Sequence, residues 1–353
     1  MIRFGWRQFR IQAAVAFAAL AALAILLAIT GTRLDHLYNT TVAGCNAQGD
    51  CQAAKNAFIA NDAFLRNGLG SLLLVVPALI GVFWGAPLIA RELETGTFRL
   101  AWTQSVTRRR WLLVKLGVVG ASSMCVAGLL SLMVTWWFSP LDRVNANRFS
   151  PAVFDVRDIA PIGYAAFAFA FAATAGALTR RTMPAIATTL VAFVGTRLAM
   201  THWLRPQLIT PAHLDLALNP TTTGYGAQDF LLFVSTSTLQ PATPNIPNAW
   251  ITSTQIVDRA GHGLTTQFLA SACPQLISDG GSAGSHHTTE VPAAAQQVLQ
   301  NCVAKVGTTY HELITYQPAS RYWDFQSLEL AIYLGVALIL AGFCLWWVRH
   351  RLS

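Results

Sequence analysis

Six long apolar stretches with almost no charge dominate this sequence, and they leave a chain few folds to adopt. Each has about 20 residues, the length of helix needed to cross roughly 30 Å of hydrocarbon at 1.5 Å per residue. They cover residues 12–31, 69–90, 111–138, 159–178, 184–203 and 328–348, with Lys115, Arg197 and Glu329 as the only charged residues inside them. We therefore predict an all-α polytopic membrane protein with six transmembrane helices.

Composition agrees with this prediction, because only 11% of the residues are charged, against roughly a quarter in an ordinary soluble domain. On a soluble protein the formal net charge of +8 would suggest nucleic acid as a partner. In this chain the basic residues are concentrated in some of the segments between the apolar stretches, so we interpret the charge as an orientation signal. The first stretch is followed by Gly31-Thr32-Arg33 rather than a typical cleavage site. We expect it to remain as the first span.

The distribution of basic residues predicts the orientation. Segments 1–11, 91–110, 179–183 and 349–353 carry twelve Lys and Arg residues in 41, whereas segments 32–68, 139–158 and 204–327 carry ten in 181. The positive-inside rule makes the first group cytoplasmic. Both termini are then inside, residues 349–353 form a cytoplasmic tail, and residues 204–327 form a large extracytoplasmic loop. We expect the cytoplasmic membrane of a bacterium as the location.

The first eleven residues have the pattern of an amphipathic helix lying in the membrane interface. Arginines on one face would reach phosphate head groups, and aromatic residues on the adjoining face would enter the acyl boundary. The residues concerned are Arg3, Trp6, Arg7, Phe9 and Arg10. An ordinary basic flank that orients the first span explains the pattern equally well.

Four of the six cysteines fall in the predicted extracytoplasmic segments, an oxidising location in which two disulfides are expected. Three connectivities are possible, and we favour Cys45–Cys51 and Cys273–Cys302 because each pair belongs to one loop. Free thiols are the alternative. The segment 204–327 is long enough for a small domain, with helical character around 291–306, and it has no recognisable catalytic or metal-binding pattern.

The segment 91–110, between the second and third spans, carries the only two acids of the predicted cytoplasmic side, Glu92 and Glu94. It also carries Leu93, Leu100 and Trp102, apolar residues that are unusual in a short solvated loop. A surface of this kind favours docking on another protein. The alternative is that these residues pack on the ends of the protein's own helices.

This segment, RELETGTFRLAWTQSVTRRRWLLVKL, resembles the loop of type-2 ABC exporter permeases: an acidic pair, Gly-Thr, an amphipathic stretch, and a Lys entering the next span. A second likeness is YQPASRYWDFQSLELAIYLGVALIL, at 316–340, which is similar to the stretch before the sixth helix in permeases that have a large outer loop there. Further agreement comes from Thr179-Arg180-Arg181 and from the region of Arg197 to Pro206.

The resemblance implies that this segment is a coupling helix that fits a groove on a cytoplasmic ATPase. Glu92 and Glu94 would pair or cap at that groove, Gly96 would permit a tight turn, and Thr97, Leu100 and Trp102 would form the docking face. The complete predicted interface is Arg91, Glu92, Glu94, Thr95, Gly96, Thr97, Arg99, Leu100, Trp102, Gln104 and Arg108.

The resemblance also implies partners and cofactors. Such permeases work as dimers above two ATPase subunits, and we expect a homodimer rather than a heterodimer. This chain has no GxxxxGK[ST] phosphate loop, so ATP and Mg would be bound by the partner ATPase and no cofactor by this chain. The implied function is a permease subunit that exports a hydrophobic or amphipathic substrate, without enzymatic activity of its own.

Arg197 is the one arginine well inside a span. A buried arginine costs at least about 2.5 kcal/mol at mid-helix, so it should face protein, water or head groups. It is a candidate for the substrate path, and the alternative is that it extends to the interface. Glu329 and Lys115 are interpreted as charges of helix ends, and the spans show no paired polar residues of the kind an intramembrane enzyme would need.

A competing function is a stand-alone membrane sensor or scaffold whose extracytoplasmic domain binds a ligand.

Overall fold

A computed structural model describes residues 2–45, 51–61, 63–96, 108–144, 148–218, 230–233, 238–241, 246, 248–274 and 293–351. The chain divides into two compact units, and each is described by itself. Residues Met1–Ile209 together with Ser320–Ser353 form the first, which we call the helical unit. Residues Thr210–Ala319 form the second, which we call the inserted unit because both of its ends continue into the helical unit.

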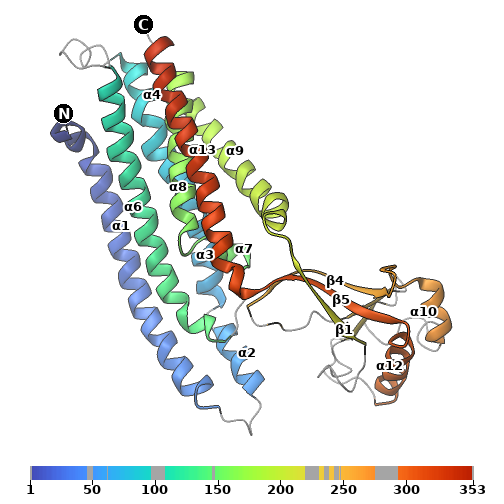
Figure 1. Cartoon of the computed structure of the whole chain (residues 1–353). Helices are drawn as coiled ribbons and strands as arrows, with labels where there is room; N and C mark the ends of the chain where they lie inside the picture. Colours follow the sequence, from blue (N-terminus) through green and yellow to red (C-terminus); the bar gives the residue numbers. More distant parts are fainter. Residues whose placement is uncertain are drawn as a thin grey trace. The chain divides into compact units, whose positions relative to one another are not determined.

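The helical unit is a bundle of long helices (Figure 1). Its α-helices are α1 (Ile2–Leu37), α2 (Cys51–Asn61), α3 (Ala63–Ile80), α4 (Ala86–Thr95), α6 (Arg108–Asp142), α7 (Pro151–Phe154), α8 (Ala160–Thr179), α9 (Thr182–Ala199) and α13 (Tyr322–Arg351). Three π-helical segments, η1 (Tyr38–Val42), η2 (Gly81–Gly85) and η3 (Met200–Leu204), and two 3-10 turns, η4 (Arg205–Gln207) and η7 (Ala319–Arg321), extend or join them.

Among the described residues, six helical runs are long and apolar enough to cross a membrane, as the sequence predicts: Ala14–Val42, Leu73–Thr95, Arg109–Asp142, Ala160–Thr179, Thr182–Gln207 and Ala319–Arg351. Several extend well beyond the predicted spans, because helical geometry continues through the polar flanks. The predicted interfacial segment 1–11 forms the start of α1, which is helical from Ile2 onward. The side chains of its first residues lie outside the described structure.

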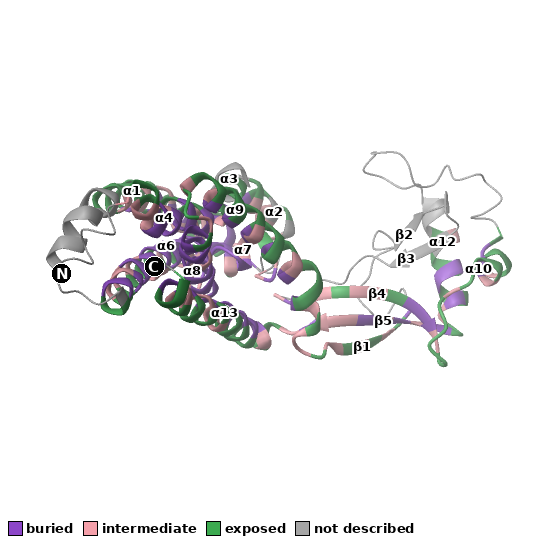
Figure 2. Ribbon diagram, turned by 90° about the horizontal axis from the view of Figure 1, so that it is seen from above, coloured by how far each residue is buried: buried purple, intermediate pink, exposed green. Residues whose placement is uncertain are grey.

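Helix α8 lies at the centre of the helical unit, and most of its residues are buried (Figure 2). Its alanines allow the run α3–η2–α4 to approach until backbones touch. A Cβ on Gly81 would lie 2.8 Å from the carbonyl oxygen of Ala168, and one on Gly85 would lie 2.6 Å from the Cβ of Ala172. Gly81 and Gly85 thus provide the small-residue surface on which two membrane helices pack closely.

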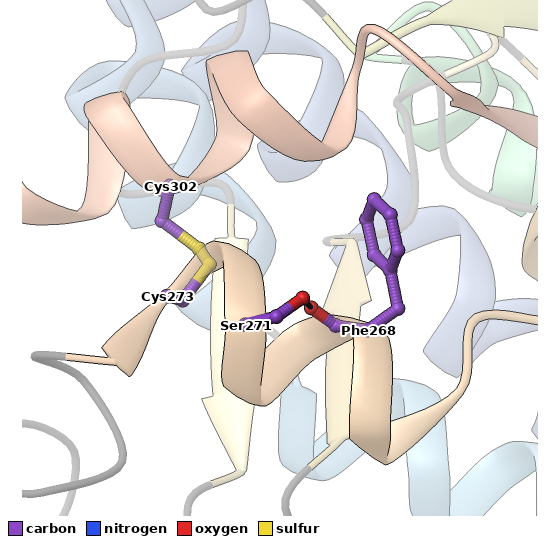
Figure 3. The surroundings of a disulfide bond; sticks show 4 residues. All are labelled: Phe268, Ser271, Cys273 and Cys302. Atoms are coloured by element: carbon purple, nitrogen blue, oxygen red, sulfur yellow. Dashed lines mark hydrogen bonds between the residues drawn. A yellow bond between two sulfur atoms is a disulfide. The ribbon is translucent and has the colours of Figure 1, made fainter.

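The predicted disulfide pairs are both present. Cys45 and Cys51 are bonded after η1, at the start of α2. Cys273, after α10 (Thr266–Ala272), is bonded to Cys302 on α12 (Ala293–Val306), as shown in Figure 3. The second bond lies in the core of the inserted unit, where both cysteines are buried against Leu269, Val303 and Tyr310.

The inserted unit contains β-sheet, so the all-α prediction is wrong for this part of the chain. Strands β1 (Ala212–Ala217), β5 (Tyr310–Gln317) and β4 (Trp250–Asp258) form an antiparallel sheet in the order β1-β5-β4. Strands β2 (Phe230–Phe233) and β3 (Thr238–Pro241) form a separate antiparallel pair. Strands β4 and β5 have nine and eight residues, and alternation of apolar and polar residues is the sequence signal that could have indicated such strands.

Strand β5 carries a buried acid. Glu312 is 2% exposed and lies in register with Leu216 of β1 and Ile256 of β4, and within the described residues its Oε1 atom has no hydrogen-bond partner. Burial raises the pKa of the Glu312 carboxyl from 4.5 to about 7. A carboxyl group in these apolar surroundings is held in its neutral form more strongly than in water.

Candidate functional site

The end of α4 forms the start of the predicted coupling segment. Residues Ala86–Thr95 continue the run of α3 and η2, and Gly96 then takes a φ of 70°. This left-handed conformation is common for glycine and rare for other residues, so Gly96 makes the tight turn that the sequence predicts at this position. Residues 97–107 lie outside the described structure, and α6 begins at Arg108.

Glu92 forms an ion pair with Lys115 on the facing helix α6. Both side chains are largely buried, and the Lys115 ammonium also lies 4.6 Å from the centre of the Trp111 ring. Lys115, which the resemblance places at the entrance of the third span, therefore links α4 to α6 through this ion pair.

Glu94 ties α4 to a different helix. Its Oε2 atom accepts hydrogen bonds from the hydroxyl of Thr182 at 2.8 Å and from the Thr182 backbone nitrogen at 3.4 Å. Thr182 is the first residue of α9, so the carboxylate lies at a helix N-terminus, where negative charge is stabilised. Arg180 Nη2, just before α9, donates to the carbonyl oxygen of Arg351 at 3.4 Å. The ends of α4, α8, α9 and α13 therefore meet at one end of the bundle.

The other residues of the predicted interface are only partly described. Arg91 and Thr95 are exposed on α4, and the Thr95 hydroxyl donates to the Arg91 carbonyl oxygen at 2.8 Å. Thr97, Arg99, Leu100, Trp102 and Gln104 lie outside the described residues, as does the side chain of Arg108. The same holds for the side chains of Arg3, Trp6, Arg7, Phe9 and Arg10. Docking on an ATPase stays a prediction for all of them.

A second feature of the helical unit is a buried cluster that we call the charge quartet: Arg197, Arg205, Asp155 and Glu329. Arg197 Nη1 lies 2.8 Å from Glu329 Oε1, and its Nη2 lies 2.5 Å from Asp155 Oδ2. Arg205 contacts the same two acids, with Nη2 2.5 Å from Asp155 Oδ1 and Nε 3.0 Å from Glu329 Oε2. No side chain of the quartet is more than 7% exposed.

Aromatic side chains enclose the charge quartet. The Tyr164 hydroxyl donates to Glu329 Oε1 at 2.7 Å, and its ring centre lies 3.8 Å from the guanidinium carbon of Arg197. The guanidinium carbon of Arg205 lies 4.2 Å from the centre of the Phe154 ring. Two positive and two negative charges balance, which is the condition under which burial of ionised groups is tolerated. The quartet therefore fastens α9 and α13 to the turn after α7.

The π-helical segment η3 brings the two arginines together. In a regular α-helix with 3.6 residues per turn, positions 197 and 205 would point about 80° apart. The wider turn at Met200–Leu204 contains extra residues per turn and returns Arg205 toward the face that carries Arg197. Both guanidinium groups can then reach the same two carboxylates.

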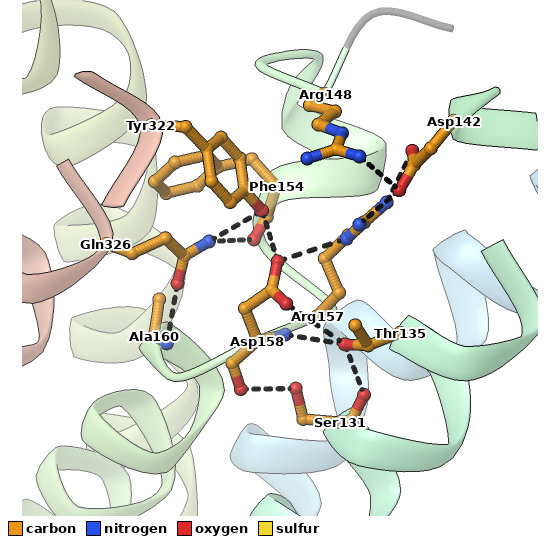
Figure 4. A network of polar contacts seen from close by, with 10 residues as sticks. All are labelled: Ser131, Thr135, Asp142, Arg148, Phe154, Arg157, Asp158, Ala160, Tyr322 and Gln326. Carbon is orange, nitrogen blue, oxygen red and sulfur yellow. Dashed lines mark hydrogen bonds and ion pairs between the residues drawn. The ribbon is translucent and has the colours of Figure 1, made fainter. Parts of the chain in front are cut away.

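A polar network lies beside the quartet, centred on Asp158 and Arg157 (Figure 4). Arg157 donates two hydrogen bonds to Asp142, at 3.0 and 2.7 Å, and the Tyr322 hydroxyl donates to Asp158 Oδ2 at 2.5 Å. Gln326 Nε2 donates to the Tyr322 hydroxyl at 3.1 Å. Burial lowers the pKa of Arg157, but Asp142 outweighs it, so that pKa lies above its ordinary value. The network joins the ends of α6 and α13.

The charge quartet was not predicted from the sequence. Arg197 was expected to face protein, water or head groups, and the structure pairs it with Glu329, 132 residues away. Its place on a substrate path stays a prediction. The interpretation of Glu329 as a helix-end charge is wrong, as is the expectation that the spans lack paired polar residues. One signal was present: the spans 184–203 and 328–348 each hold a single charge, and the two charges are of opposite sign.

Comparison with known proteins identifies one relationship. The family model described as "ABC-2 membrane transporter related" matches residues 17–205. The matched range reaches from the first apolar helix to the end of the fifth. It includes residues 86–115, which we call the α4 hairpin, the turn before α9 and three members of the charge quartet. No curated protein and no solved structure matches the chain.

Proposed function

The chain belongs to the ABC-2 membrane transporter related family, and from this membership we propose that it is the permease subunit of an ABC exporter. A separate ATPase subunit hydrolyses ATP, and this chain moves a hydrophobic or amphipathic substrate across a bacterial cytoplasmic membrane. The observation that carries the proposal is the family match, which covers five of the membrane-length helical runs and includes the α4 hairpin.

The contacts of the α4 hairpin support its role as the coupling segment. Glu92 and Glu94 fix α4 to α6 and α9, so a displacement of the hairpin by an ATPase would move both helices. Helix α9 is fixed at its other end by Arg197 and Arg205. A shift that begins at the hairpin can therefore reach α13 through the charge quartet, because ionised groups in a buried cluster resist separation.

The proposed assembly is a homodimer of this chain above two ATPase subunits, which bind ATP and Mg. The basic ends of the bundle face the cytoplasm, and the inserted unit lies on the extracytoplasmic side. The two disulfides are compatible with that side, because disulfides persist in oxidising compartments.

Co-purification tests the proposal. The tagged full chain is expressed with a candidate ABC ATPase subunit from the same genome, and we expect the ATPase to be retained and its hydrolysis to be stimulated. The variant Leu100→Glu/Trp102→Glu should lose at least tenfold of this retention, because two apolar contacts of the predicted docking face become charged. Lys305→Glu, at an exposed position of the inserted unit, is the control.

Exchanging the charges of Glu92 and Lys115 distinguishes the ion pair inside the chain from a contact between Glu92 and the ATPase. Glu92→Lys alone places two positive charges together and should lower stability; Glu92→Lys/Lys115→Glu restores the ion pair and should restore the melting temperature. We expect ATPase retention to stay low in the exchanged variant. If retention also returns, Glu92 acts only inside the chain.

The competing function makes the opposite prediction. A stand-alone sensor or scaffold would bind a ligand through the inserted unit, retain no ATPase and tolerate Leu100→Glu/Trp102→Glu without loss of function.

A further inference from the structure

A cavity of about 730 Å³ opens at the turn between α8 and α9. Its lining consists of Glu94, Arg180, Arg181, Met183 and Pro184, all of them exposed. Two guanidinium groups therefore face a space large enough for a small polar group, at an end of the membrane bundle.

The formal charge of the lining residues is +1, with two arginines against one glutamate. The carboxylate of Glu94 is already bonded to Thr182, whereas neither Arg180 nor Arg181 forms an ion pair with any side chain in the described ranges. Within the described residues, the Arg180 guanidinium donates to the backbone oxygen of Arg351 at 3.4 Å. Guanidinium groups present paired donors that match the oxygens of a phosphate.

The cavity continues into an apolar surface. Met183 at its rim is 77% exposed, and the same side of α9 carries exposed Val191, Val194 and Leu198, at 75%, 53% and 54%. These positions extend over about 15 residues, or roughly 22 Å of helix. Since α9 is one of the six membrane-length helices, an acyl chain can lie along this surface.

We propose that Arg180 and Arg181 bind the head group of an anionic phospholipid, with an acyl chain along the exposed face of α9. Basic pockets at the ends of transmembrane helices recognise such head groups by this combination of charge and adjoining apolar surface. An acidic protein segment would use the arginines but not the apolar face. The head group would lie near the hydrogen bond between Glu94 and Thr182, which connects α4 to α9.

Native mass spectrometry of the purified full chain tests the site. The protein is incubated with phosphatidylglycerol or with phosphatidylcholine of the same acyl chains, and we expect phosphatidylglycerol to be retained at least tenfold better. Arg180→Gln/Arg181→Gln should abolish this preference. Arg109→Gln/Arg349→Gln, which removes two exposed arginines outside the cavity, is the matched control and should preserve it. All four positions are exposed, so the variants should keep the melting temperature of the parent protein.

A second arm separates a lipid from a free phosphate. Glycerol 3-phosphate carries a phosphate at least as negative as that of the head group but no acyl chains, and it should not displace phosphatidylglycerol at equal concentration. Met183→Ser/Val191→Ser should weaken retention of phosphatidylglycerol several-fold, because it removes apolar contacts along α9.

Four results would overturn the proposal. They are equal retention of both lipids by the parent protein, equal loss in the matched control, displacement by glycerol 3-phosphate, and unchanged lipid retention in Arg180→Gln/Arg181→Gln with loss of ATPase capture. The last would assign the arginines to protein docking.

Discussion

Glu329 and Glu312 are both buried carboxylates, and their surroundings differ. Glu329 is fully buried with two arginines within 3.0 Å, so its negative charge is balanced where it lies. Glu312 lies among apolar side chains with an unbonded oxygen, so burial favours its neutral form. One residue type is therefore accommodated as an ion in the helical unit and as a neutral acid in the inserted unit.

Neutralising Glu329 should destabilise the helical unit. Glu329→Gln leaves Arg197 and Arg205 with one carboxylate between them, and breaking a buried ion pair in this way costs about 3 kcal/mol. A clear fall in melting temperature is expected in detergent. Asp324→Asn, at an exposed position on the same helix, should change stability by less than about 0.5 kcal/mol. If both variants melt alike, the quartet contributes nothing to stability.

The pH dependence of the inserted unit should follow Glu312. Its pKa is about 7 in the folded chain and near 4.5 when exposed, so its stabilising contribution is complete below about pH 4.5 and is lost as the pH rises through 7. The full effect is at most about 3 kcal/mol. Calorimetry at pH 5, 6, 7 and 8 should show Glu312→Gln to be the more stable protein at pH 8. Parallel pH profiles for the two proteins would contradict this assignment.

The disulfides and the charge quartet differ in how far the sequence alone predicts them. The disulfide partners could be predicted because members of each pair are near in sequence and share a compartment. The charge quartet could not, because Arg197 and Glu329 meet only after α9 and α13 pack on α8. Hydropathy records that a charge is present in a span but not what it faces.

Among the elements, the contact between α8 and the run α3–η2–α4 depends on glycine. Gly85→Ala should lower stability by about 1–3 kcal/mol, because its Cβ would lie 2.6 Å from the Cβ of Ala172 and 2.8 Å from the Phe169 carbonyl oxygen. Gly342→Ala is the control, since nothing lies within 4 Å of a Cβ at that position. Thermal unfolding in detergent measures both, and equal melting temperatures would exclude close packing at Gly85.

The six apolar helices could be predicted from hydropathy alone, because each must bury its backbone hydrogen bonds within itself. The strands of the inserted unit are harder to predict from the sequence. Strand β5 alternates buried and less buried residues from Tyr310 to Ile314, but its partners β1 and β4 lie far apart in the sequence, and Glu312 interrupts the apolar face. Pairing between distant strands leaves only a weak local signal.

At the scale of the whole molecule, the inserted unit should depend on its disulfide. Cys273 and Cys302 are separated by 29 positions, and closing a loop of that length stabilises a fold by about 3.5 kcal/mol. Cys273→Ser/Cys302→Ser should make residues 210–319 sensitive to proteases while the helical unit stays resistant. Cys125→Ser, which removes a free thiol, is the control. Equal protease resistance in both variants would show that the bond is dispensable.

The pairing of β1 with β5 brings the two ends of the inserted unit close together. Ala212, just after the chain enters the inserted unit, is the register partner of Tyr316, just before the chain leaves it. Entry and exit are therefore about 5 Å apart, the spacing of neighbouring strands. A segment whose two ends nearly touch behaves as a cassette: a turn of a few residues can replace it, or another domain can be spliced in, without moving the helices on either side.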